Sequence, residues 1–152
     1  MMERYLTDEE KLIEVARWIV YRSDATNQAP PDQEGGWGYP DPDVFELTDM
    51  LNAIEGVLTD QSCAGHLHSG ETPGETSMWD GKLWLRLSEP MMERFTADAY
   101  RLYESPTIER LQRIFHRDVG DIVEIIFQGN NRGKLAESGA AIVAFFSQLA
   151  ER

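Results

Sequence analysis

The segment from Lys82 to Leu87 alternates between apolar and polar side chains, and this limits the folds open to the chain. Its two faces hold different residues: Leu83, Leu85 and Leu87 on one, and Lys82, Trp84 and Arg86 on the other. Successive side chains of a strand point to opposite faces, so the pattern predicts a sheet with one buried face. Antiparallel sheets commonly have one packed and one solvated face.

Helical spacing of apolar residues predicts four helices around this strand. We expect them over about residues 8–21, from Asp43 to Gly56, from Ser88 to about Glu104, and over 135–150. The first begins with a capping box, Thr7 to Glu10, and carries an apolar face: Leu12, Ile13, Val15, Ala16, Ile19 and Val20. The last has apolar residues that we expect to be largely buried: Ala136, Ala140, Ile142, Val143, Phe146 and Leu149.

Two further strands are indicated by β-branched residues, a short one at Val57–Thr59 and another at Ile122–Gln128. Residues 107–117 fit either a helix or a strand. The turn-like sequence at 117–121, with Gly120, favours a hairpin, so we prefer two paired strands here. The prediction is therefore an α+β fold: two N-terminal helices, then β-β-α-β-β-α, with a mainly antiparallel sheet covered by helices.

A chain of 152 residues fits a single domain spanning 1–152. Two long polar loops interrupt it, at 23–43 and 63–81. Loops of this length inside a compact domain are commonly functional or mobile. The longest apolar run, Ala140–Phe146, is too short to span a bilayer. One cysteine excludes an internal disulfide, so we expect a cytoplasmic protein.

Charge is distributed unevenly along the chain. Residues 1–80 contain 17 acids and 4 bases, whereas residues 81–152 contain 10 of each. An acidic surface repels phosphate backbones, so nucleic acid is not an expected partner. A metal ion or a cationic protein fits this surface, and solubility alone also explains it.

The only cysteine lies close to two of the three histidines, in Cys63-x-x-His66-x-His68. These side chains are ligands that zinc accepts, so Cys63, His66 and His68 form a candidate metal site. A structural zinc site usually has a second pair, which this sequence lacks. Alternatively, Cys63 acts as a nucleophile with His66 or His116 as base, although the surrounding acids oppose a thiolate.

A third interpretation uses the backbone around Ser62, Cys63 and Gly65, whose amides would hold a small anion or carbonyl group. His66 and Arg86 would then be further ligand-binding residues, with other arginines adding positive charge if they converge: Arg110, Arg113 and Arg132. The ordinary alternative is that these arginines lie at exposed strand and turn positions.

The segment Asn52-x-x-x-Gly56-Val57-x-Thr59-x-x-Ser62-Cys63-x-Gly65-His66 resembles an uncharacterised family of small microbial and phage proteins. Those usually have Pro where this chain has Glu55. The Ser-Cys-x-Gly core is also similar to the wybutosine-synthesis type of tRNA methyltransferase, which has a basic residue at the position of His66. The resemblance covers about a tenth of the chain and implies a strand–loop–strand arrangement without an established activity.

Two functions follow as hypotheses. One is a small-ligand or metal site at the Ser62–His68 loop, with zinc as the candidate metal. The other is a non-enzymatic acidic module that binds a cationic protein partner through the base-free region 23–81. A homodimer is compatible with both, because Trp84 lies on the polar face of its strand and the last helix is strongly apolar.

Overall fold

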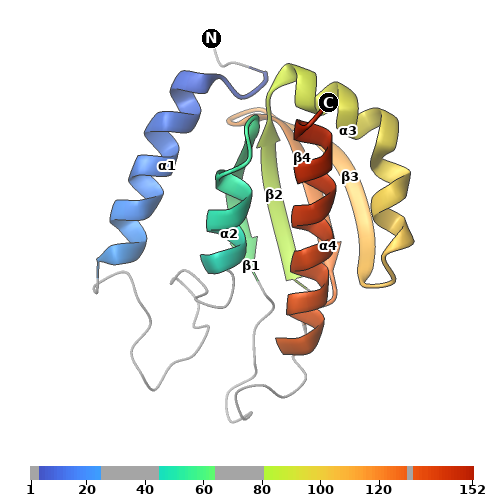
Figure 1. The fold of residues 1–152 in the computed structure, drawn as a ribbon. Coiled ribbons are helices and arrows are strands. Elements are labelled where there is room, and N and C mark those ends of the chain that lie inside the picture. The colour runs from blue at the N-terminus through green and yellow to red at the C-terminus, as the bar shows by residue number, and fades with distance from the viewer. Residues whose placement is uncertain (1–3, 25–44, 64–80, 130–131) are drawn as a thin grey trace.

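The computed structural model describes residues 4–24, 45–63, 81–129 and 132–152, and for 61–63 and 132 only the path of the backbone (Figure 1). In chain order its elements are α1 (Asp8–Ser23), α2 (Phe45–Asn52), β1 (Val57–Cys63), β2 (Gly81–Leu87), α3 (Glu89–Asp98), the 3-10 helix η3 (Ala99–Glu104), β3 (Ile108–His116), β4 (Gly120–Phe127) and α4 (Arg132–Ala150). The predicted α+β class and element order are confirmed.

The four strands form one antiparallel sheet in the order β1-β2-β4-β3. Figure 1 shows α2, α3 and α4 lying over one face of this sheet, with α1 beside α2 at the β1 side. The strands β1 and β3 are therefore the two edges. We call the face that α2, α3 and α4 leave uncovered the open face.

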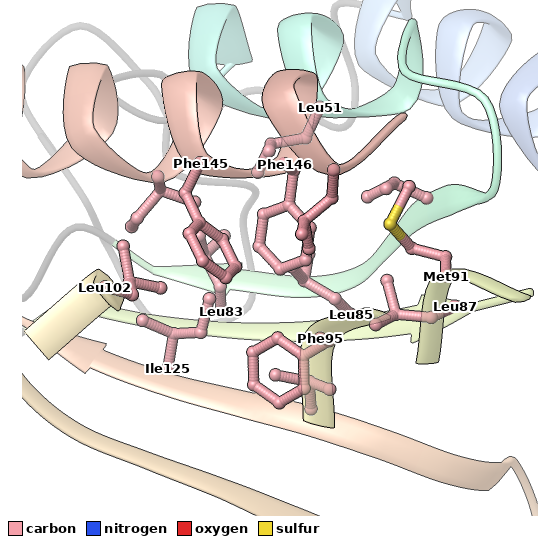
Figure 2. Close-up of a cluster of buried hydrophobic side chains, with 14 of the residues drawn as sticks. Leu51, Leu83, Leu85, Leu87, Met91, Phe95, Leu102, Ile125, Phe145 and Phe146 are labelled. Atoms are coloured by element: carbon pink, nitrogen blue, oxygen red, sulfur yellow. The ribbon is translucent and has the colours of Figure 1, made fainter. Parts of the chain in front are cut away.

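The core lies between the covered face and these helices (Figure 2). The leucines that alternate along β2 are fully buried in it, as the sequence predicts: Leu83, Leu85 and Leu87. Three phenylalanine rings form its centre, where Phe95 stacks on Phe146 at 6.0 Å and Phe145 meets Phe146 edge-on at 5.1 Å. Burial of this apolar surface is the main stabilising contribution to the fold.

The ambiguous segment 107–117 is a strand, β3, and it pairs with β4 as a hairpin. Gly120 has a φ of 97°, which L side chains rarely adopt, so glycine suits this turn. Gly56, after α2, likewise has a φ of 80°. The Gly56 carbonyl accepts from the Ser88 amide at 2.9 Å, which closes the end of the β1–β2 pair.

Some sequence predictions need correction. Strand β1 extends to Cys63 instead of ending near Thr59, with a bulge between Thr59 and Gln61. The helix after Ser88 is α-helical only to Asp98 and then tightens into η3. In α4, Ala136 and Ala140 are exposed, because the face that they share turns towards a surface groove instead of the sheet. Val143 is half-buried, whereas Ile142, Phe146 and Leu149 are buried as expected.

Candidate functional site

The structure describes only some of the predicted ligand residues. Ser62 and Cys63 are in the last two positions of β1, paired through the backbone with Leu83 and Lys82 of β2. Gly65, His66 and His68 lie outside the described residues. Within the described part of the chain, no group of three or more His, Cys, Asp or Glu could hold a metal ion. The metal and ligand predictions at 62–68 therefore remain predictions.

Arg86, the fifth predicted ligand residue, projects from β2 on the open face and is 5% exposed. Its guanidinium forms an ion pair with Glu10 of α1. Two of the arginines proposed to converge with it pair with different carboxylates: Arg110 with Glu124 at 3.0 Å and Arg113 with Asp121 at 2.6 Å. The side chain of the third, Arg132, lies outside the described residues. The positive charge of Arg86, Arg110 and Arg113 is thus divided among three acids instead of being gathered at one point.

Glu124 is the centre of a polar network on the open face. Its carboxylate accepts hydrogen bonds from the Trp84 indole at 2.8 Å and from Arg110 at 3.0 Å, and also from the Gln112 amide. Burial opposes ionisation of Glu124, but these three donors outweigh it and hold the pKa of the carboxyl below its usual value. The network keeps a charged carboxylate on an otherwise buried strand.

Trp84 is enclosed on this face by two groups. The Lys82 ammonium lies 4.9 Å from the centre of its ring, a distance typical of a cation–π contact. The His116 ring lies 6.0 Å away and is tilted by 54°. His116 Nδ1 in turn accepts from the Asp118 amide at 3.1 Å. The Trp84 indole N–H and His116 Nδ1 thus both have hydrogen-bond partners on the open face.

Helix α1 packs on the rest of the protein with its polar side. The Lys11 ammonium donates to the Ile54 carbonyl, and the Trp18 indole donates to Asp49 at 3.1 Å. Arg22 pairs with the same Asp49 at 3.0 Å. Burial lowers the pKa of Lys11, although Glu55 and Asp8 oppose the effect. No residue of α1 is buried, and the helix is held by these polar contacts together with the edge-on contact of the Trp18 ring with Phe45 at 5.5 Å.

The opposite side of α1 is apolar and exposed. Leu12 is 74% exposed and Val20 72%, while Ile13 and Ile19 are 44% and 47% exposed. At 100° per residue these four side chains and Ala16 fall within one continuous band of the helix. We call this band the α1 stripe: Leu12, Ile13, Ala16, Ile19 and Val20.

A shallow groove lies between α2 and α4, with a volume of about 310 Å³. Its lining is mostly apolar and consists of Glu46, Leu47, Met50, Leu135, Ala136, Gly139, Ala140 and Val143. Gly139 lies beside Leu47, and a Cβ there would meet Leu47 at an ordinary contact distance of 3.5 Å. The groove contains one charged side chain and no cluster of polar groups that would orient a substrate.

Sequence reasoning did not identify the α1 stripe as a surface feature. The spacing of its residues predicts a helix with an apolar face but not the direction in which that face points. A signal was present nonetheless: the positions between the apolar ones contain Lys11, Trp18 and Arg22, whose long side chains reach α2 and the turn that follows it.

No family model and no curated protein matches this chain. Among solved structures, that of the PH1069 protein from Pyrococcus horikoshii is similar over 95% of this chain and 90% of the other, with 14% sequence identity and a TM-score of 0.40. A similarity of this size indicates neither a shared family nor a function. No described helix is long and apolar enough to cross a membrane.

Proposed function

We propose that the protein is a non-enzymatic interaction module that binds a basic amphipathic helix of a partner protein through the α1 stripe. The single observation that supports this most is the packing of α1, which turns the side with Lys11, Trp18 and Arg22 inwards and leaves the α1 stripe exposed. A contiguous exposed apolar surface is typical of a binding site for another protein. An apolar helix face is commonly bound by a second helix with matching apolar residues.

The charge around the stripe supports a cationic partner. The described residues 4–24 and 45–63, which include α1, contain nine acids and four bases. Glu9 lies one turn before Ile13, while the one base that borders the stripe, Arg17, is paired with Glu14 at 2.7 Å. Complementary charge accelerates association and disfavours acidic partners.

A lysine-rich amphipathic peptide tests the proposal, with leucines spaced to match the stripe. A second peptide with glutamate in place of every lysine is its control. Titration calorimetry with the wild-type protein should detect binding of the first peptide only, and the affinity should fall as salt is raised. Binding of both peptides, or of neither, contradicts the proposal.

Substitutions that leave the net charge unchanged separate the contribution of apolar contact to peptide binding from the contribution of charge. The double variant Leu12→Ser, Val20→Ser should bind the lysine peptide at least about tenfold more weakly, because it removes apolar contact area. Gln148→Ser, an exposed change on α4, is the matched control and should leave binding unchanged. If the wild type is a dimer that only the double variant dissociates, a second copy occupies the stripe and the cationic partner is wrong.

The second candidate is a small-ligand or metal site at Ser62–His68. It is supported by the position of Ser62 and Cys63 at the end of an ordered strand, just before His66. Elemental analysis of untagged protein purified without chelator tests it. Near-stoichiometric zinc that is lost in both Cys63→Ser and His66→Ala supports the site, whereas no metal after repletion removes the zinc hypothesis.

A further inference from the structure

The two edges of the sheet differ in what protects them. At the β1 edge, the Asn52 side chain of α2 accepts from the Thr59 amide at 2.8 Å. At the β3 edge, the Tyr103 hydroxyl of η3 accepts from the Leu111 amide at 2.7 Å and lies 3.4 Å from the Leu111 carbonyl oxygen. Tyr103 therefore takes the place that a neighbouring strand would occupy, but at one residue only.

The rest of the β3 edge is open. Backbone groups along an edge strand alternate between pairing inwards and pointing outwards. Since Leu111 points outwards and the β3–β4 register is regular from Arg110 to His116, Arg113 and Phe115 point outwards as well. Within the described parts of the chain, no hydrogen bond engages the outward N–H and C=O groups of these two residues. Such groups are a template for another strand.

The charge distribution indicates which molecule can approach this edge. In the strand order β1-β2-β4-β3, the β3 edge is farthest from β1, where α1 and α2 also lie. The described residues 4–24 and 45–63 contain nine acids and four bases, a net charge of −5, whereas the described residues from 81 onwards contain ten of each. Two copies that meet at β3 thus keep their acidic parts apart, and contact at the β1 side would bring them together.

We propose that β3 pairs with β3 of a second copy, antiparallel, about a two-fold axis at Ile114. In this register Arg113 lies opposite the partner's Phe115, and each such pair exchanges two backbone hydrogen bonds. The result is a continuous sheet across both subunits. A two-fold axis makes the contact closed, so it yields a dimer and not a fibre.

The side chains suit this register. Phe115 is 68% exposed and would lie beside the side chain of the partner's Arg113, whose aliphatic part it can cover. Ile114 would contact the partner's Ile114 on the open face as an apolar cross-strand pair.

Tyr103 selects this register over its neighbours. In a register shifted towards the start of β3, the Leu111 backbone would have to pair with the partner strand. That pairing would displace the Tyr103 hydroxyl from the Leu111 amide. The axis at Ile114 uses only the free groups of Arg113 and Phe115 in its central pairs. The contact is short, and an interface below about 1,000 Å² is typical of weak association, so we expect a concentration-dependent dimer.

Sedimentation equilibrium of the full chain tests the dimer. The average mass should rise from 17.3 kDa towards twice that value with concentration. Phe115→Pro removes one outward N–H without touching the β4 ladder and should abolish the rise, because proline is tolerated on edge strands. Phe115→Ala keeps the N–H and should weaken association less. A monomer at every concentration, or a dimer that persists in Phe115→Pro, overturns the proposal.

Disulfide trapping tests the register. In a Cys63→Ser background, Ile114→Cys should cross-link on oxidation with diamide, because non-hydrogen-bonded pairs bring Cβ atoms about 4.5–5.5 Å apart. Gln112→Cys is the matched control and should not cross-link, since it would lie opposite the partner's His116. Equal cross-linking of both variants contradicts the axis at Ile114. The Leu12→Ser, Val20→Ser variant should dimerise like the wild type. The experiment therefore tests the β3 dimer independently of peptide binding to the α1 stripe.

Discussion

Arg113 donates a hydrogen bond of 2.6 Å to Asp121 across the β3–β4 hairpin, and Arg4 donates to the same carboxylate oxygen at 2.8 Å. Asp121 is 3% exposed, so its charge depends on these two donors. Asp121→Asn should lower the free energy of unfolding by about 2 kcal/mol, typical of a lost hydrogen bond to a charged group. Urea unfolding at neutral pH measures this. Asp118→Asn, an exposed carboxylate in the adjacent turn, is the control and should change little.

Acid should destabilise the fold through Asp121 and Glu124. Burial opposes their ionisation, but hydrogen bonds from arginines and other donors hold the pKa of each carboxyl below its usual value. Because the folded pKa is the lower one, this contribution to stability is complete above the unfolded pKa of about 4 and is lost as pH falls through the folded pKa. The double variant Asp121→Asn, Glu124→Gln should therefore lose less stability between pH 7 and pH 3 than the wild type. An identical pH dependence would contradict this assignment.

Gly56→Ala should destabilise the protein by about 1–3 kcal/mol, the cost of a non-glycine residue at a strained backbone position. Its φ is 80°, and an added Cβ would lie 2.6 Å from the Ser88 hydroxyl. That hydroxyl caps α3 by accepting from the Met91 amide at 3.3 Å. Thermal unfolding gives the size of the loss. Ser88→Ala alone, which removes the cap, should cost only about 1 kcal/mol.

Gly139→Ala, in contrast to Gly56→Ala, should stabilise the protein. The residue is inside α4, and a Cβ there would meet Leu47 at an ordinary contact distance of 3.5 Å. Replacing a glycine within a helix by alanine stabilises by about 0.5–1 kcal/mol. A raised midpoint of thermal unfolding would confirm it, and a lowered one would mean that α2 and α4 are more tightly packed here than the structure indicates.

Tyr103→Phe should strengthen the proposed dimer. The variant removes the hydroxyl from Leu111 and leaves the Leu111 amide and carbonyl free for a partner strand. The pairing can then extend by one residue at each end, and the dissociation constant measured by sedimentation should fall. Tyr100→Phe on the same 3-10 helix is the control, because Tyr100 is exposed and its hydroxyl contacts only Arg101. An unchanged dissociation constant would argue against Leu111 as the limit of the pairing.

The sequence was most informative where one face of an element must be buried. The alternation in β2 identified the face of the sheet that packs on the helices, and the glycine at position 120 identified the β3–β4 hairpin. The other face is less exposed than the alternation predicts, since Arg86, Ile122 and Glu124 on it are buried. The spacing of apolar residues shows that a helix has an apolar face but not whether that face points to the core or to solvent. The exposure of the α1 stripe was therefore not predicted. That orientation depends on contacts of Lys11, Trp18 and Arg22 with a different helix, and such pairs are not encoded in local spacing.

The candidate site illustrates the same limit. Clustering of Cys63 with His66 and His68 in the sequence predicts a set of metal ligands. Only the distances among these side chains would define such a set, and the three side chains lie outside the described residues. The network at Glu124 was not predicted. The β3–β4 hairpin brings Arg110 and Gln112 close to Glu124, but Trp84 reaches it only because β2 is the other neighbour of β4 in the sheet.

The first described residues join the sheet between its central strands. The Leu6 amide donates to the Leu87 carbonyl at 2.9 Å, and the Asp121 amide donates to the Arg4 carbonyl at 3.0 Å. The Arg4–Asp121 contact closes a separation of 117 residues. On a ribosome, the contacts of Arg4 with Asp121 can form only after β4 has emerged, so the segment that precedes α1 gains its last partner late in synthesis.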